Sequence, residues 1–299
     1  MEKKLLLIVN PCSGRAKMKT ELLCVVDTLS RGGYEVTVYT TKERGDGTRR
    51  AEQIKENEYD TVVVCGGDGT LNEVITGLMN NGVKCRIGYI PSGTLNEWSS
   101  GLHISRNIPD AAADITRGKT IHLDIGKFND RYFTYTASFG AFTEASYSAP
   151  QDVKNILGQA AYFFEGIKSL GNIKPIHLCF KLDGREIEDD FIFGAISNSM
   201  SVGGIVKFDE AVVELDDGLF EVLLIKNPQN LIQLQNIIDG ILRKDLKREN
   251  IEFFHASELT VTGGDNVSWT LDGEYAPGSS TVPISNIHSA IEFIVPNIS

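Results

Sequence analysis

Short apolar runs alternate with stretches of helical periodicity over the first 120 residues. The runs are rich in aliphatic residues and bounded by turn residues, which predicts buried strands at Lys4–Val9, Glu35–Thr40, Asp60–Cys65 and Arg86–Ile90. Between them, apolar residues at helical spacing predict helices around Leu22–Leu29, Thr48–Glu58 and Leu71–Met79. This alternation of strand and helix predicts an α/β domain in which helices cover both faces of a parallel sheet.

From about residue 121 the pattern changes to strands separated by tight turns. The strands expected here are Ile121–Phe128, Tyr132–Phe139, Ile176–Leu182, Phe191–Ser197, Leu219–Ile225, Ile251–His255, Leu259–Thr262 and Val267–Leu271. Two helical stretches, Val153–Leu170 and Leu231–Leu242, interrupt them. We therefore expect an α/β domain over residues 1–120 and a mostly antiparallel β-sandwich domain over residues 121–285. The last segment, 286–299, contains one more strand that could return to the first domain.

Composition and charge exclude several classes of protein. Of 299 residues, 41% are hydrophobic and 23% charged, which is typical of a folded globular chain. The net charge of −11 argues against a general nucleic-acid binder. The longest aliphatic run, Leu5–Val9, is too short for a membrane span or a signal peptide. The five cysteines and five histidines show no metal-site spacing, so we expect a cytoplasmic protein with reduced thiols.

Three glycine-bearing turns follow the first, third and fourth predicted strands. They are Asn10-Pro11-Cys12-Ser13-Gly14, Gly66-Gly67-Asp68-Gly69-Thr70-Leu71-Asn72 and Pro91-Ser92-Gly93-Thr94-Leu95-Asn96. Each places backbone N–H groups at the start of a helix, where the helix dipole favours anions. The first 50 residues also hold ten lysines and arginines against six acidic residues. Because parallel strands end at one edge of a sheet, we expect an anion-binding site there.

The turn after the third strand is the most informative. Its glycines let backbone approach a phosphate without a Cβ in the way, and the spacing of Thr70 and Glu73 fits a helix capping box. Asp68 would repel a phosphate unless a cation lay between them, so the turn suggests Mg²⁺. The alternative is an ordinary strand-to-helix turn that Asp68 or Thr70 caps.

Together the three turns resemble those of the diacylglycerol-kinase-like lipid kinase family, which includes soluble bacterial enzymes and the sphingosine and ceramide kinases. The Gly66–Thr70 segment alone is also similar to segments of NAD kinases and phosphofructokinases, but the other two turns favour the lipid kinases. The resemblance implies an α/β nucleotide domain followed by a β-sandwich. It implies transfer of the γ-phosphate of ATP, with Mg²⁺, to a lipid hydroxyl, and diacylglycerol is the expected acceptor. An NAD kinase and a nucleotide-binding regulator without turnover stay open as alternatives.

The resemblance also implies which residues contact ATP. They are Asn10, Pro11, Cys12, Ser13, Gly14, Thr41, Gly66, Gly67, Asp68, Gly69, Thr70, Leu71, Asn72 and Thr94. Two positions depart from the family pattern. Cys12 stands where serine or threonine is usual, and Glu97 stands where aspartate is common.

Two acidic turns of the second domain match family motifs. In Asp272-Gly273-Glu274, the resemblance implies that Glu274 takes the proton of the lipid hydroxyl, with Asp68 as the other catalytic residue. A solvated hairpin glutamate is the alternative. In Glu214–Leu219, it implies a Mg²⁺ site formed by the Asp217 side chain and the carbonyls of Glu214 and Leu219. An ordinary Asp-Gly turn explains that segment equally well.

A lipid kinase must reach a bilayer without spanning it. The apolar face of the predicted helix at Leu231–Leu242 is followed by the basic segment Arg243–Arg248. Such a helix could lie on an anionic membrane surface, although a face of this kind more often packs on the protein core. We therefore expect a cytoplasmic enzyme with transient membrane contact and no nucleic-acid partner. The oligomeric state stays open, a homodimer included.

Overall fold

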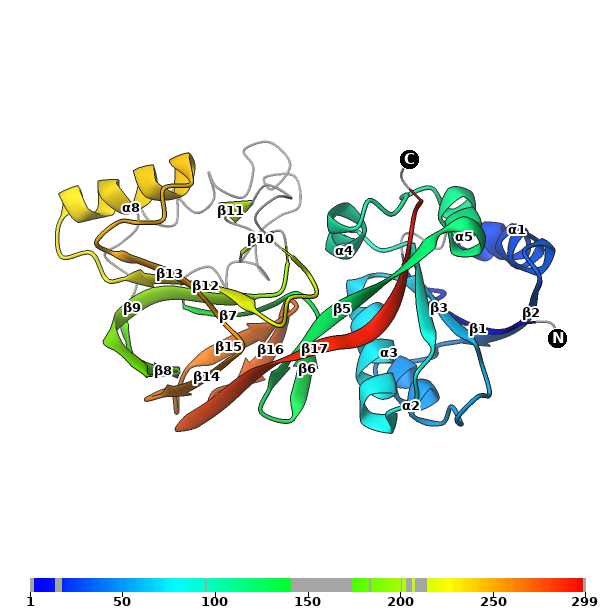
Figure 1. The fold of residues 1–299 in the computed structure, drawn as a ribbon, viewed down its shortest axis with the longest axis horizontal. Coiled ribbons are helices and arrows are strands. Elements are labelled where there is room, and N and C mark those ends of the chain that lie inside the picture. The colour runs from blue at the N-terminus through cyan, green and yellow to red at the C-terminus, as the bar shows by residue number, and fades with distance from the viewer. Residues whose placement is uncertain are drawn as a thin grey trace. The chain divides into compact units, whose positions relative to one another are not determined.

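A computed structural model describes residues 3–13, 18–94, 96–140, 174–182, 184–199, 201–202, 206–207 and 214–297 (Figure 1). The predicted helix over 153–170 and the site residue Gly14 lie outside the described residues. The chain forms two compact units, one of residues 1–123 with 289–299 and the other of residues 124–288. Each unit is described by itself below.

The first unit is built on a parallel sheet with the strand order β17-β4-β3-β1-β2. Its strands are β1 (Lys3–Val9), β2 (Tyr34–Thr40), β3 (Thr61–Gly66), β4 (Arg86–Pro91) and the end of β17 (Thr281–Val295). The central strand β3 is buried along its whole length, because helices cover the sheet on both faces. Since β1, β3 and β4 run in parallel, their carboxyl ends and the turns that follow them lie at one edge.

Five helices cover this sheet in the described part of the unit. They are α1 (Met18–Arg31), α2 (Asp46–Glu52), α3 (Asp68–Asn81), α4 (Glu97–Gly101) and α5 (Ile108–Arg117). Helix α1 packs beside α5 on one face, and α2 packs beside α3 on the other (Figure 1). Helix α5 was not among the expected helices. Its start is nevertheless encoded locally, because the Asn107 side chain accepts a hydrogen bond from the N–H of Asp110 (3.1 Å) and Pro109 lies in the first turn.

The capping box expected at Thr70 and Glu73 is wrong. Helix α3 begins at Asp68, three residues before the expected start at Leu71, with Gly67 as its N-cap. The Glu73 carboxylate instead accepts hydrogen bonds from the N–H groups of Gly45 (2.8 Å) and Gly47 (3.0 Å). It thereby ties α3 to the start of α2.

The second unit is an antiparallel β-sandwich, so the predicted fold class is confirmed for both parts of the chain. Its strands are β5 (Lys119–Phe128), β6 (Arg131–Phe133), β7 (Thr136–Gly140), β8 (Ile176–Leu182), β9 (Arg185–Ser197), β10 (Ser201–Val202), β11 (Val206–Lys207), β12 (Phe220–Lys226), β13 (Ile251–Ala256), β14 (Glu258–Thr262), β15 (Ser268–Leu271), β16 (Glu274–Pro277) and the start of β17. The long strand β9 pairs with β8 along its first half and with β7 and β12 along its second half. Aromatic rings fill the interior, where Phe139 lies 4.8 Å from Trp269 and 6.0 Å from Phe180 between ring centroids.

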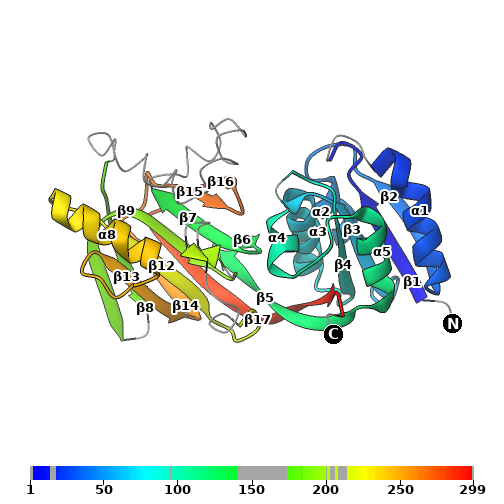
Figure 2. The same ribbon diagram turned by 90° about the horizontal axis from the view of Figure 1, so that it is seen from above.

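Helix α8 (Leu231–Arg243) lies across β12 and β13 (Figure 2). Its apolar face packs through Leu234, Ile237 and Ile241 on a core cluster of the sheet. That face is therefore buried against the sheet, whereas Leu231 and Ile232 at the start of the helix are exposed. Among the described helices, none has the length and apolar character to cross a bilayer.

One carboxyl group is buried on β12. Glu221 is 2% exposed, and among the described residues its Oε2 atom has no hydrogen-bond partner. Burial, with a contribution from nearby Asp217, raises the pKa of Glu221 to about 8 from an ordinary value of 4.5. A group with a raised folded-state pKa keeps its proton in the folded state while the unfolded chain loses it. The free energy of unfolding therefore falls as pH rises between these two values.

We expect Glu221→Gln to remove this pH-dependent fall in the free energy of unfolding, because the amide does not titrate in this range. In urea unfolding without magnesium, the variant should be more stable than the parent at pH 8 by on the order of 1–3 kcal/mol, with little difference at pH 5. The exposed Glu258→Gln serves as the control and should show no such trend. A Glu221→Gln effect of the same size at both pH values would contradict the titration.

Candidate active site

Hydrogen bonds join the three glycine-bearing turns at the carboxyl edge of the first sheet. The Asn10 side-chain amide donates to the hydroxyl of Thr70 (3.0 Å), which links the turns after β1 and β3. The hydroxyls of Ser13 and Ser92 lie 2.6 Å apart and link the turns after β1 and β4. The N–H of Ser92 donates to the carbonyl of Gly66 (2.8 Å) and links the turns after β3 and β4. The turns thus form one connected edge.

The turns after β3 and β4 approach each other through glycine backbone. A Cβ built on Gly93 would lie 2.6 Å from the Cα of Gly67, so no larger residue fits there without movement. The Asn96 side chain fixes the turn after β4. It accepts a hydrogen bond from the N–H of Gly93 and donates one to the carbonyl of Gly93 (2.9 Å each). Asn96 has a φ of 50°, a left-handed conformation that asparagine tolerates.

Asp68 occupies the first position of α3, at the positive end of the helix dipole. The buried phenol of Tyr89 lies 3.5 Å from its Oδ1 atom, 3.3 Å from the carbonyl of Gly66 and 3.2 Å from Oδ1 of Asn96. Burial, and then the charge of Asp68, raise the pKa of Tyr89. The phenol therefore stays protonated and can donate to these oxygens. A carboxylate beside an anion-binding edge is suited to hold a divalent cation.

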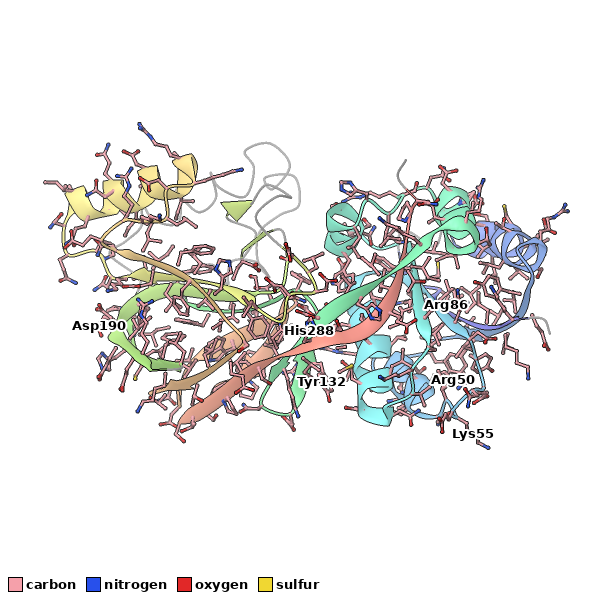
Figure 3. The ribbon with its side chains drawn as sticks, viewed as in Figure 1. Arg50, Lys55, Arg86, Tyr132, Asp190 and His288 are labelled. Atoms are coloured by element: carbon pink, nitrogen blue, oxygen red, sulfur yellow. The ribbon has the colours of Figure 1, made fainter. Side chains whose placement is uncertain are left out.

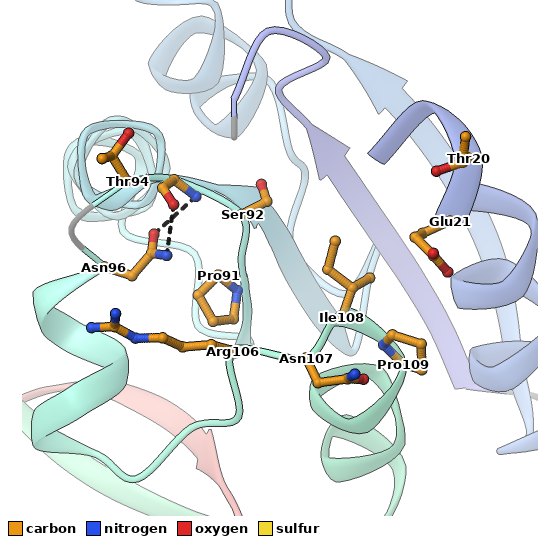
Figure 4. A pocket seen from close by; sticks show the side chains of 11 residues that line it. Thr20, Glu21, Pro91, Ser92, Thr94, Asn96, Arg106, Asn107, Ile108 and Pro109 are labelled. Carbon is orange, nitrogen blue, oxygen red and sulfur yellow. Dashed lines mark hydrogen bonds between the residues drawn. The ribbon is translucent and has the colours of Figure 1, made fainter. Parts of the chain in front are cut away.

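A cavity of about 540 Å³ lies beside this edge (Figure 4). It is lined by Thr20, Glu21, Pro91, Ser92, Gly93, Thr94, Asn96, Arg106, Asn107, Ile108 and Pro109. Thr94 was among the predicted site residues, but Arg106 was not. The Arg106 guanidinium donates to the Ser100 hydroxyl (2.9 Å) and is close enough to Tyr89 to lower its pKa. No motif marks Arg106, because it lies in an irregular segment between α4 and α5.

The structure places the other predicted residues of the first unit along or near the same edge. Thr41 directly follows β2, and its N–H donates to the carbonyl of Val9 (2.9 Å). Cys12 is exposed, and its N–H donates to Oδ1 of Asn10 (3.0 Å). Leu71 lies in α3 with a fully buried side chain, so only its backbone can face a ligand. Pro11 lies in the turn after β1, and Gly69 and Asn72 lie near the start of α3.

The turn between β15 and β16 holds Glu274 in the second unit. Asp272 and Gly273 both have positive φ (49° and 82°), as a tight two-residue hairpin turn requires. The Asp272 carboxylate accepts hydrogen bonds from N–H and Oγ1 of Thr134 (2.6 and 2.7 Å) and from the N–H groups of Tyr135 (2.9 Å) and Thr136 (3.0 Å). Asp272 therefore anchors the turn, and Glu274, the first residue of β16, is partly exposed.

The acidic segment Glu214–Leu219 forms a turn in the second unit. Oδ1 of the exposed Asp217 accepts from the N–H of Leu219 (2.9 Å). The fully buried Asp124, which sequence analysis overlooked, accepts from the N–H of Gly218 (2.7 Å). An exposed carboxylate on a turn of backbone carbonyls offers the hard oxygen atoms that Mg²⁺ prefers, so the segment fits such an ion chemically.

Both parts of the chain match known protein families. Residues 4–128 match the diacylglycerol kinase catalytic domain, and residues 137–293 match the YegS C-terminal NAD kinase beta sandwich-like domain. A diacylglycerol kinase of Staphylococcus aureus (strain MRSA252) is 32% identical over 298 residues, which cover 99% of this chain and 94% of the relative.

Solved structures extend the similarity. The crystal structure of a protein assigned as a diacylglycerol kinase from Bacillus anthracis is 27% identical, with a TM-score of 0.80, over 99% of this chain and 96% of that one. A second structure from the same organism is 25% identical, with a TM-score of 0.78, over 98% and 97% of the two chains. Similarity of this extent in sequence and fold shows that the chain is a kinase and belongs to the diacylglycerol kinase family.

Proposed function

We propose that this kinase transfers the γ-phosphate of ATP to the hydroxyl of diacylglycerol and so forms phosphatidic acid. The observation that carries the proposal is the connected edge of three glycine-bearing turns beside the cavity of about 540 Å³. Phosphoryl transfer requires positioned phosphates, neutralised charge and a base for the attacking hydroxyl. Residues of this chain provide for each requirement.

The edge of the first sheet is the phosphate-binding part of the proposed site. The backbone of Gly66–Asn72, the Asn10 turn, Thr41 and Thr94 would hold the nucleotide. When bound, Mg²⁺ neutralises charge on the phosphate oxygens, and Asp68 is the residue that would hold it there. Arg106 adds a planar guanidinium to the cavity, and such a group binds anionic oxygens through two parallel hydrogen bonds.

Glu274 is the proposed general base. Its carboxylate takes the proton of the lipid hydroxyl as that oxygen bonds to the γ-phosphorus and the bond from phosphorus to the departing ADP oxygen breaks. The anchoring of Asp272 supports this role, because it fixes the turn that presents Glu274. A second Mg²⁺, held by Asp217 and the carbonyls of Glu214 and Leu219, would stabilise the turn at Glu214–Leu219.

The acceptor is proposed from the relatives, which are named diacylglycerol kinases. The NAD kinase-like description of the second domain keeps NAD as the rival acceptor. Purified protein with ATP and Mg²⁺ should phosphorylate diacylglycerol in mixed micelles and leave NAD unchanged. Phosphorylation of NAD alone would show that NAD, and not diacylglycerol, is the acceptor. ATP binding without phosphorylation of diacylglycerol or NAD would favour a nucleotide-binding regulator.

Glu274→Gln should lower kcat by about 10²- to 10⁴-fold, because the amide cannot accept the hydroxyl proton. Its affinity for ATP, measured by calorimetry, should stay within about twofold of the parent, well below the tenfold that 1.4 kcal/mol represents. The matched control is Glu258→Gln, an exposed glutamate of the same unit, which should keep parental kcat. Parental turnover by Glu274→Gln would show that the base assignment is wrong.

Arg106→Ala should raise the KM for ATP by roughly 10- to 100-fold, since a charge-assisted hydrogen bond contributes about 1.5–3 kcal/mol. Arg106→Lys should recover part of the loss, because lysine keeps the charge but not the planar fork. Arg117→Ala, at the exposed end of α5, provides the control. An unchanged KM in Arg106→Ala would remove Arg106 from the nucleotide site.

A further inference from the structure

The outward face of the β8–β9 hairpin gathers a thiol, an imidazole and three carboxylates. The antiparallel register pairs His177 with Asp190, Cys179 with Glu188 and Lys181 with Glu186. The alternate residues Leu178 and Phe180 belong to the sandwich core, so this row points away from it. Figure 3 labels Asp190 on this outer side of the second unit.

The potential donor atoms of this row lie close together. The Cys179 sulfur is 3.0 Å from Oε1 of Glu186, and the ligand atoms of Cys179, Glu186 and Glu188 all lie within 4.8 Å of one another. Nε2 of His177 is 3.1 Å from Oε1 of Glu188. Zinc bonds of 2.0–2.3 Å place tetrahedral donors about 3.3–3.8 Å apart. Small side-chain shifts would bring Cys179, Glu186 and Glu188 to that spacing, whereas His177 lies outside their 4.8 Å group and needs a larger shift.

The histidine already has the orienting partner that zinc sites use. Its Nδ1 atom is 2.9 Å from Oδ1 of Asp190, and its Nε2 atom is 3.1 Å from Oε1 of Glu188. A carboxylate bonded to the far nitrogen of a metal-binding histidine fixes the ring and increases its basicity. The arrangement of Asp190, His177 and the neighbouring donors follows this pattern.

We propose that Cys179, His177, Glu186 and Glu188 bind one Zn²⁺ ion, with Asp190 orienting His177. A thiolate and an imidazole favour zinc over Mg²⁺ or Ca²⁺, which prefer oxygen ligands. Binding releases the thiol proton of Cys179 to solvent as the zinc–sulfur bond forms. Three carboxylates in the row also favour a cation. Lys181 pairs with Glu186 at 3.6 Å, but its side chain is 54% exposed and can turn outward.

The proposed site is separate from the residues assigned to catalysis, and its effect would be on the hairpin itself. An ion with ligands on both β8 and β9 binds the folded hairpin and not the unfolded chain. It therefore raises the stability of the second unit through linkage.

The test uses the full chain, stripped of metal and then kept in a millimolar excess of Mg²⁺. Zn²⁺ affinity is measured by competition with a chromogenic chelator, and Co²⁺ serves as a spectroscopic substitute. We expect one zinc equivalent bound at this site, a thiolate-to-cobalt charge-transfer band, and a melting temperature that rises with zinc. Absence of the thiolate band, or displacement of the metal by Mg²⁺, would overturn the proposal.

Variants tie the binding to these residues. Cys179→Ser should abolish the cobalt band and the zinc-dependent rise in melting temperature. Asp190→Asn should keep the band but weaken zinc binding by about 10- to 100-fold, as loss of an orienting partner does. Cys24→Ser, which removes an exposed cysteine of the first unit, is the matched control and should behave as the parent. Parental zinc binding by Cys179→Ser would exclude the site.

Discussion

Gly67 and Gly93 face each other across the ends of β3 and β4 with no side chain between them, and the candidate active site depends on that approach. It brings the start of α3, with Asp68, beside the turn that Asn96 holds in place. With the two turns farther apart, the hydrogen bond from Ser92 to Gly66 could not form. The connected edge of the three turns is thus a property of backbone packing more than of any single polar side chain.

The two acids of the Asp272-Gly273-Glu274 turn differ in their surroundings. The Asp272 carboxylate accepts four hydrogen bonds from Thr134, Tyr135 and Thr136, and these bonds hold the chain in a tight turn. Burial raises the pKa of the Asp272 carboxyl above its ordinary value, and the hydrogen bonds from Thr134, Tyr135 and Thr136 oppose that shift only in part. Glu274 differs because it lies at the first position of β16 and is partly exposed.

Much of the fold follows from local patterns, whereas several site features depend on tertiary contacts. The buried runs at β1 and β3 are unambiguous because a parallel sheet is apolar on both faces. Glu73 looked like a capping residue, yet its partners are N–H groups that are distant in sequence. Arg106 reaches the cavity from an irregular segment, and no periodicity marks such a position. The row at Cys179 arises from strand register, which spacing along the chain does not reveal.

Strand β17 begins in the sandwich, where it pairs with β14, and ends in the first unit, where it pairs in parallel with β4. The edge partner of β4 is thus supplied by the last part of the chain, after the whole second unit. During synthesis, the first sheet cannot be completed until that segment has left the ribosome, although its other strands are made early. Closing such a long intervening segment carries an entropic cost that favours prior folding of the sandwich. The edge strand that completes the first sheet is therefore made after the second unit.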